Sequence, residues 1–397
     1  MQIEEFIQAL KADRQEPLCA YIYDLNRLRD HARSVIAALP ERCRFFYAIK
    51  ANSEQPILRA LAPLVHGFEV ASIGEIEKVR AVSATTPIIF GGPGKTDAEL
   101  RSALRQRVSL LHVESIHELR RLQAIAAELN TVALVLLRVN LRGPLPTATL
   151  QMAGTPTQFG IDEAELPAAI LEAQRSPQID LQGFHLHSLS NNLNADEHVR
   201  LIAHYIDRVY GWAQEFGLHV RVVNIGGGIG VNYAQLDRQF DWQRFTTQLG
   251  ALLEQDDRAR EWRLIFECGR FVTAACGWYA AEVLDIKRNH GTDFVIVRGG
   301  TQHFRLPVSW QHNHPFVVVP IETWRYPFAR PVLQDASVTI TGQLCTPKDV
   351  FAHDAQISRV RAGDVVLFVQ AGAYGWSISH HDFLSHPHPE QIFVGEV

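Results

Sequence analysis

One pattern repeats through the first two-thirds of this chain: a short apolar run ends in glycine or polar residues, and a segment with helical periodicity follows. The runs are rich in Val, Ile, Leu and Phe, which is typical of strands buried on both faces of a parallel sheet. They begin at Cys43, Val65, Pro87, Ser109, Val132, Asp180, Val220 and Arg263. Eight β-then-α units over about 250 residues predict a (β/α)8 barrel, with a doubly wound open sheet as the structural alternative.

The segments between the runs predict amphipathic helices, among them Ser72–Ala84, Asp97–Arg107 and Ile116–Leu129. Two of these segments open with the spacing Ser-x-x-Glu, at Ser72 and Ser115, which is a helix-capping signature.

The sequence changes character after Arg270. Short alternating segments follow, separated by Gly, Pro, Asn and Asp, and they predict strands at Phe294–Val297, Phe316–Ile321, Ser337–Thr341 and Asp364–Val369. We therefore expect a barrel domain over residues 27–270, and a β-rich domain, sandwich-like or barrel-like, built from residues 1–26 and 271–397.

Composition and charge narrow the class of protein. The 397 residues are 47% hydrophobic and 20% charged, as in ordinary globular proteins. A net charge of −5 gives no electrostatic signal for nucleic acid or an anionic membrane, so a small-molecule partner is expected. The five cysteines contain no C-x-x-C pair, and Glu4 and Glu5 stand where a signal peptide would carry positive charge. We expect a cytoplasmic protein with free thiols.

Polar residues gather at the ends of the predicted strands, where a barrel places its active site. They are Lys50, His185, His187, Ser188, Gly226–Gly228, Glu267 and Arg270. Each alone has an ordinary explanation: a surface lysine, a βα turn, a core histidine, a structural ion pair. Their convergence on one rim favours a shared site.

These residue types suit one cofactor. A desolvated lysine has a lowered pKa and can form a Schiff base. A glycine-rich turn that opens a helix offers N–H groups to a phosphate. A carboxylate can pair with a protonated pyridine nitrogen, and an imidazole can stack on the ring. Together they indicate pyridoxal 5′-phosphate.

Several motifs resemble one family from end to end. They include Ala48-Ile49-Lys50-Ala51-Asn52, Glu69-Val70-Ala71-Ser72, Phe159-Gly160-Ile161, Gly226-Gly227-Gly228, Glu267-Cys268-Gly269-Arg270, Cys345-Thr346-Pro347-Lys348-Asp349 and Gly372-Ala373-Tyr374. The chain resembles the alanine-racemase-fold decarboxylases, the group that contains ornithine/arginine and diaminopimelate decarboxylases.

The resemblance implies a role for each matching position. Lys50 matches the Schiff-base lysine, Glu267 the partner of the pyridine nitrogen, and His185 the residue that stacks on the ring. The phosphate ligands match Ser188, Gly227, Gly228, Arg270 and Tyr374.

The resemblance also implies a head-to-tail homodimer with shared active sites. Cys345 matches the cysteine that the neighbouring subunit contributes, where it protonates the carbanion after carbon dioxide leaves. Lys50, Cys345, Glu267 and His185 are thus the expected catalytic residues. Asp349, Arg138 and His187 are candidates for substrate contacts, and we expect no metal. The histidine-rich tail at His380-His381 and His386-Pro387-His388 aligns with a closing strand of the family.

Departures from the family pattern bear on the substrate. Thr346 stands where diaminopimelate decarboxylase has a glutamate that reads the distal amino group. The run His187-Ser188-Leu189-Ser190-Asn191-Asn192 is most similar to decarboxylases of carboxylate-type siderophore pathways, which act on an amino acid joined to citrate or a similar acid. Alternatives are a free diamino acid decarboxylase, a racemase, which would need a tyrosine base opposite the lysine, and a non-catalytic cofactor-binding homologue.

Overall fold

The structure is a computed structural model that describes residues 2–12, 14–143, 150–151 and 154–396. The chain divides into two compact units, which are described separately. Residues 29–232 and 237–272 form the barrel unit, and the remaining described residues form the β-unit. Within the described residues, no helix is both long enough and apolar enough to span a bilayer.

Eight parallel strands of the barrel unit close into a ring. They are β2 (Cys43–Ala48), β3 (Gly67–Val70), β4 (Ile88–Phe90), β5 (Leu110–Val113), β6 (Ala133–Asn140), β9 (Ile179–His185), β11 (Val222–Asn224) and β12 (Arg263–Cys268). β12 pairs with β2, and β5 pairs with β6, so no edge of this sheet is left open. The predicted barrel is therefore confirmed and the open-sheet alternative is wrong.

Side chains fill the inside of the ring. One buried cluster consists of Phe46, Ile89, Leu110, Leu136, Val222 and Ile265, which come from six different strands. Gly67 on β3 makes room for this cluster, because a Cβ atom there would lie 2.2 Å from the ring of Phe46. The interior is thus a packed core, and chemistry is left to the strand ends.

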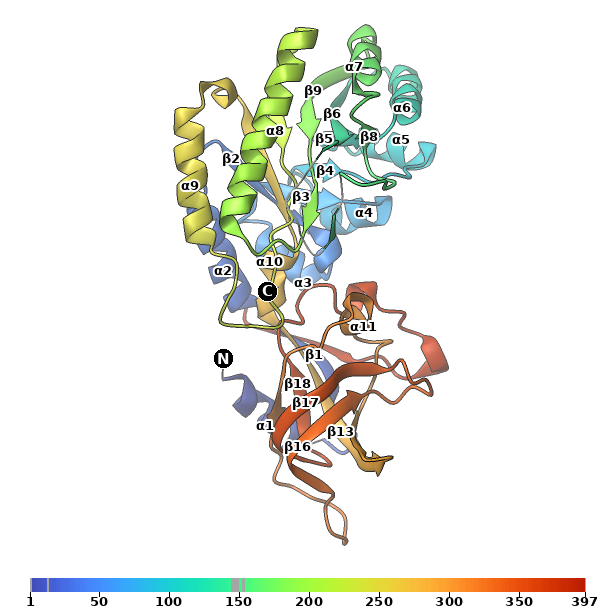
Figure 1. The fold of residues 1–397 in the computed structure, drawn as a ribbon. Coiled ribbons are helices and arrows are strands. Elements are labelled where there is room, and N and C mark those ends of the chain that lie inside the picture. The colour runs from blue at the N-terminus through green and yellow to red at the C-terminus, as the bar shows by residue number, and fades with distance from the viewer. Residues whose placement is uncertain (1, 13, 144–149, 152–153, 397) are drawn as a thin grey trace. The chain divides into compact units, whose positions relative to one another are not determined.

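Helices surround the strands (Figure 1). They are α2 (Leu25–Ala37), α3 (Gln55–Leu61), α4 (Ile73–Val82), α5 (Asp97–Arg105), α6 (Ile116–Glu128), α7 (Leu166–Arg175), α8 (Ala195–Phe216) and α9 (Trp242–Gln255). The predicted caps are present: Ser72 and Ser115 accept hydrogen bonds from the N–H groups of Glu75 and Glu118. Short pieces complete the unit: β8 (Ile161–Asp162) beside β6, β7 (Leu150–Gln151) paired with β10 (Leu189–Ser190), and α10 (Arg270–Thr273).

The β-unit is a mixed sheet. Its strands are β1 (Cys19–Asp24), β13 (Gly277–Asn289), β14 (Thr292–Val297), β15 (Phe316–Val319), β16 (Val332–Thr341), β17 (Val350–Arg361), β18 (Val365–Phe368) and β19 (Glu390–Val394), with helices α1 (Ile3–Ala12) and α11 (Leu306–Trp310). The order is β15-β18-β13-β14-β16-β17, and β1 pairs with both β13 and β19. The N-terminal strand is thus held between two strands that follow the barrel in sequence.

Candidate active site

Lys50 lies directly after β2, in the short 3-10 turn Ile49–Ala51. Its two neighbours are buried, whereas its own side chain is 49% exposed. The Lys50 Nζ lies 3.1 Å from Oε2 of Glu69, a buried carboxylate on β3. In this chain an ion pair with Glu69 holds the lysine, and the desolvation expected from the sequence is incomplete.

Glu267 near the end of β12 is the centre of a buried polar group. Its Oε1 accepts a 2.6 Å hydrogen bond from Nδ2 of Asn224. The Nε2 atoms of His112 and His185 lie 3.6 and 3.5 Å from its two oxygens. Burial raises the pKa of Glu267 to about 8, the negative charge of Glu69 adds to this, and the positive charge of Lys50 opposes it. Glu267, Glu69 and Lys50 thus act on one another electrostatically.

Three imidazoles lie side by side in the same pocket. The rings of His112 and His185 stack with centroids 3.9 Å apart, and the ring of His187 lies 6.3 Å from that of His185. The pKa of each of these three imidazoles is lowered well below the ordinary range, and burial makes the largest contribution. Both ring nitrogens of His185 lack a hydrogen-bond partner among the described residues. The stack is therefore neutral, and His185 can still bind a further group.

The glycine turn after β11 lies against this group. Gly226 and Gly228 have φ angles of 69° and 84°, in the region that favours glycine. A Cβ atom on Gly227 would lie 2.2 Å from the carbonyl oxygen of Glu267. The Gly227 N–H donates to Nδ1 of His187 at 3.2 Å. His187, expected at the substrate, thus supports the turn in this structure.

Two further predicted ligands lie in the barrel unit. The hydroxyl oxygen of Ser188 is buried and has no hydrogen-bond partner in the described part of the chain, while its N–H donates to the hydroxyl oxygen of Tyr205. Arg270 is buried at the start of α10, which Gly269 separates from β12. Ser188 follows His185 of β9 by three residues, and Arg270 follows Glu267 of β12 by three residues.

Arg138 on β6 belongs to a buried ion pair with Glu114, which follows β5. The same carboxylate accepts hydrogen bonds from the N–H groups of Gly92 and Gly160. Glu114 therefore connects three loops at the strand ends, and Arg138 balances its charge.

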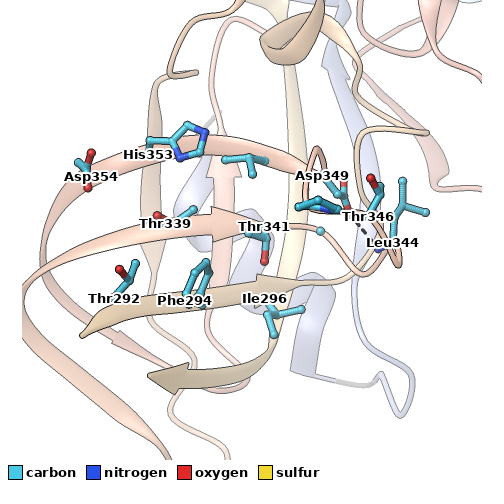
Figure 2. Close-up of a pocket in the computed structure, with 13 residues that line it drawn as sticks. Thr292, Phe294, Ile296, Thr339, Thr341, Leu344, Thr346, Asp349, His353 and Asp354 are labelled. Carbon is cyan, nitrogen blue, oxygen red and sulfur yellow. Dashed lines mark hydrogen bonds between the residues drawn. The ribbon is translucent and has the colours of Figure 1, made fainter. Parts of the chain in front are cut away.

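The remaining predicted residues lie in the β-unit. Cys345 is exposed, and Tyr374 lies half-buried with a φ of 53°. Asp349 is buried, and its two oxygens accept hydrogen bonds from the N–H groups of Thr301 at 2.7 Å and Leu344 at 2.8 Å. Figure 2 shows Asp349 and Thr346 at one end of a hollow of about 510 Å³ whose other end carries His353 and Asp354.

Sequence reasoning missed three buried polar residues of the barrel site, His112, Glu114 and Asn224, and gave Glu69 no role. Each lies in or directly after a barrel strand, within an otherwise apolar run. A polar residue inside a buried strand is unfavourable unless it is paired, and this was the signal that could have identified them.

The donor set fits pyridoxal phosphate better than a metal ion. His112, His185 and Glu267 lie close enough together to hold a metal, with their ligand atoms within 4.8 Å of one another. However, the Asn224 Nδ2 atom, a donor, faces both Glu267 Oε1 and His112 Nε2. A neutral imidazole face, a buried carboxylate, a free serine hydroxyl and a turn without Cβ atoms are what a flat ring with a phosphate requires.

Comparison with known proteins decides the family. Residues 25–274 match the family described as the pyridoxal-binding domain of pyridoxal-dependent decarboxylases. The chain belongs to the pyridoxal-dependent decarboxylases. The expected family, the cofactor pyridoxal phosphate and the decarboxylase activity are thereby confirmed.

Curated decarboxylases match nearly the whole chain. It is 50% identical over 392 residues to 2-[(L-alanin-3-ylcarbamoyl)methyl]-2-hydroxybutanedioate decarboxylase of Staphylococcus aureus, covering 99% of this chain and 98% of that protein. It is 32% identical to L-glutamyl-[BtrI acyl-carrier protein] decarboxylase of Niallia circulans, covering 94% of this chain and 87% of that protein. Among solved structures, diaminopimelate decarboxylase of Helicobacter pylori complexed with L-lysine has a TM-score of 0.85 at 26% identity, covering 99% of this chain and 94% of that one.

Proposed function

We propose that this decarboxylase removes the α-carboxylate of an amino acid that is already joined through an amide to a hydroxy-polycarboxylic acid, in the synthesis of a carboxylate-type siderophore. The observation that carries the proposal is the 50% identity, over 99% of the chain, to the Staphylococcus aureus enzyme. The name of that enzyme describes an alanine whose C3 is linked through a carbamoyl group to a hydroxybutanedioate. Such a substrate has one amino acid end and one end with two carboxylates.

The loop around Cys345 supports an anionic substrate. Thr346 has no charge, so it cannot form an ion pair with a distal amino group of a substrate. Gln343 lies two residues before Cys345, and its Oε1 accepts a 2.5 Å hydrogen bond from the guanidinium of Arg298. Its Nε2 lies 3.1 Å from Nδ1 of His386. A guanidinium and an imidazole near this loop favour carboxylates over ammonium groups.

Pyridoxal phosphate supplies the ring that accepts the electron pair left by the departing carboxylate. In the proposed site Lys50 holds the cofactor covalently, Glu267 pairs with its ring nitrogen, and His185 packs on its ring face. Ser188, Gly227, Gly228, Arg270 and Tyr374 bind the phosphate. Cys345, contributed by the second subunit of a homodimer, delivers the proton that replaces the carboxylate.

The test is carbon dioxide release by the cofactor-loaded protein. The panel contains the amide of citrate with 2,3-diaminopropionate, free 2,3-diaminopropionate, diaminopimelate and ornithine. We expect kcat/KM for the citrate amide to exceed that of every free amino acid by at least about a hundredfold, since two desolvated carboxylate contacts contribute about 3 kcal/mol. Faster turnover of diaminopimelate or ornithine would show that the chain is a free amino acid decarboxylase.

A further inference from the structure

Asn224 has all of its polar atoms engaged. It is fully buried at the end of β11, and its Oδ1 accepts a 2.9 Å hydrogen bond from the N–H of Gly226. Because a backbone N–H can only donate, the Oδ1 atom must face Gly226. The Nδ2 atom, which has two hydrogens, therefore faces Glu267 Oε1 at 2.6 Å and His112 Nε2 at 3.1 Å.

This orientation determines the tautomer of His112. Its Nε2 must accept a hydrogen from Asn224, so the ring hydrogen lies on Nδ1. Burial, followed by the positive charges of Arg138, Lys95 and Lys50, lowers the pKa of His112 well below its ordinary range, which keeps the ring neutral. The same ring stacks on His185.

Asn224 also affects the charge of Glu267. Charged or titratable groups act on Glu267 from five other elements: Glu69 on β3, Lys50 in the turn after β2, Arg138 on β6, His112 on β5 and His185 on β9. Burial and Glu69 favour the protonated carboxyl, whereas Lys50, the hydrogen bond from Asn224 and Arg138 favour the carboxylate. Among the named groups, Asn224 donates the hydrogen bond that fixes the position of Oε1.

We propose that Asn224 is a positioning residue. Its amide group, with His112 as one acceptor, keeps Glu267 ionised and facing the cofactor ring nitrogen. The same amide group links Glu267 to the glycine turn at Gly226. The inference rests on the proposed roles of Glu267 and of Gly227 and Gly228. One amide thereby sets both ends of the cofactor site: the carboxylate at the ring nitrogen and the backbone at the phosphate.

The test uses Asn224→Leu, which keeps the branched heavy-atom skeleton of the side chain and removes its hydrogen bonds. Holoenzyme is reconstituted with pyridoxal phosphate labelled with ¹⁵N in the ring, and the ¹⁵N chemical shift is followed between pH 6 and 9. Without the donor, Glu267 holds its own proton more strongly, so the ring nitrogen signal should move towards the unprotonated value. The cofactor dissociation constant should rise about tenfold, since a hydrogen bond to a charged group is lost and Gly226 loses its acceptor.

His112→Phe provides a second, gentler variant. It preserves a ring against His185 and removes the acceptor, so the ¹⁵N shift should change in the same direction by less. In the double variant the effects should not add, because both residues act through one hydrogen-bonded chain. The matched control is Gln182→Leu on β9, which removes a buried amide whose Nε2 has no hydrogen-bond partner in the described residues. It should leave the ¹⁵N shift and cofactor affinity unchanged.

A wild-type ¹⁵N shift and cofactor affinity in Asn224→Leu would overturn the inference. If that variant does not fold, additive effects of His112→Phe and Glu267→Gln on the ¹⁵N shift would overturn it instead. The proposed role of Glu267, on which the inference rests, fails in a different way: Glu267→Gln would then leave the ring nitrogen signal unchanged, whatever happens at Asn224. Failure of the proposed substrate would appear only in the carbon dioxide assay.

Discussion

At the scale of single residues, the site depends on how opposing influences on Glu267 are balanced. The carboxyl is buried beside Glu69, and both facts favour its neutral form. A carboxylate can pair with a pyridinium only when it is ionised. Lys50, Arg138 and Asn224 are the groups in this chain that act in that direction.

A pH dependence of stability follows from this balance. In cofactor-free protein the folded pKa of Glu267 is raised to about 8, whereas the unfolded value is the ordinary one near 4.5. Between these values the unfolded chain has released a proton that the folded chain retains, so the free energy of unfolding falls as pH rises. Glu267→Gln should therefore lose less stability than wild type between pH 5 and pH 8.

Urea unfolding of cofactor-free protein at the two pH values measures this difference. The histidines of the site, whose pKa values are lowered, change stability in the opposite direction, but they are common to both proteins and cancel in the comparison. Glu254→Gln, an exposed glutamate of α9, is the control. Equal pH dependence in wild type and Glu267→Gln would show that Glu267 ionises normally.

The sequence predicted site residues best where a residue type at a strand end has few possible chemical roles. Lys50, Glu267 and the three glycines could be named because a lysine, an acid and a Gly-rich turn at strand ends suit one cofactor. His112 and Asn224 could not, because their importance lies in contacts between β5, β11 and β12. Those contacts depend on the register of strands that are distant in sequence, which a single sequence does not contain.

At the scale of elements, the loop that carries Cys345 depends on Asp349. Both oxygens of Asp349 are engaged by backbone N–H groups, and Cβ atoms on Gly300 and Gly342 would lie 2.8 and 2.4 Å from them. We therefore propose that Asp349 positions the Cys345 loop, in place of the substrate contact expected from the sequence.

Asp349→Asn should show this effect. An amide cannot accept from both N–H groups, so one of them stays buried without a partner and the folded state loses about 2 kcal/mol. The kcat should fall at least tenfold while the cofactor dissociation constant stays constant. Asp354→Asn is the matched control, an exposed aspartate on β17 at the other end of the hollow in Figure 2. Equal kcat values for the two variants would contradict the positioning role.

Strand prediction succeeded for the eight apolar runs of the barrel and was incomplete in the β-unit. All eight barrel runs are strands. In the β-unit the sequence indicated β14, β15, β16 and β18, but not β1, β13 or β17, and β1 was missed although five of its six residues are buried. The second half of β13 is mostly exposed, and β17 alternates irregularly between buried and exposed residues. Pairing with β14 stabilises β13, and pairing with β16 stabilises β17. The composition of β13 and β17 does not reveal this pairing.

At the scale of the whole molecule, the proposed homodimer takes Lys50 and Cys345 of each site from different subunits. Lys50→Ala and Cys345→Ala proteins should each be nearly inactive. Mixed in equal amounts under subunit exchange, half of the dimers should be hybrids with one intact site, which gives about a quarter of wild-type activity per site. Exchange is verified with a mass-tagged subunit. Demonstrated exchange without recovery would place both residues of a site in one chain.

The carboxylate of Glu114 has a consequence for protein engineering. It accepts hydrogen bonds from Arg138 on β6 and from the N–H of Gly160, directly before β8. The residues just before Gly160 include Thr155, Pro156 and Gln158, which are exposed and can change at small cost to folding. Libraries that vary these exposed residues can therefore be screened for altered substrate range without first stabilising the barrel, provided that Glu114 is left unchanged.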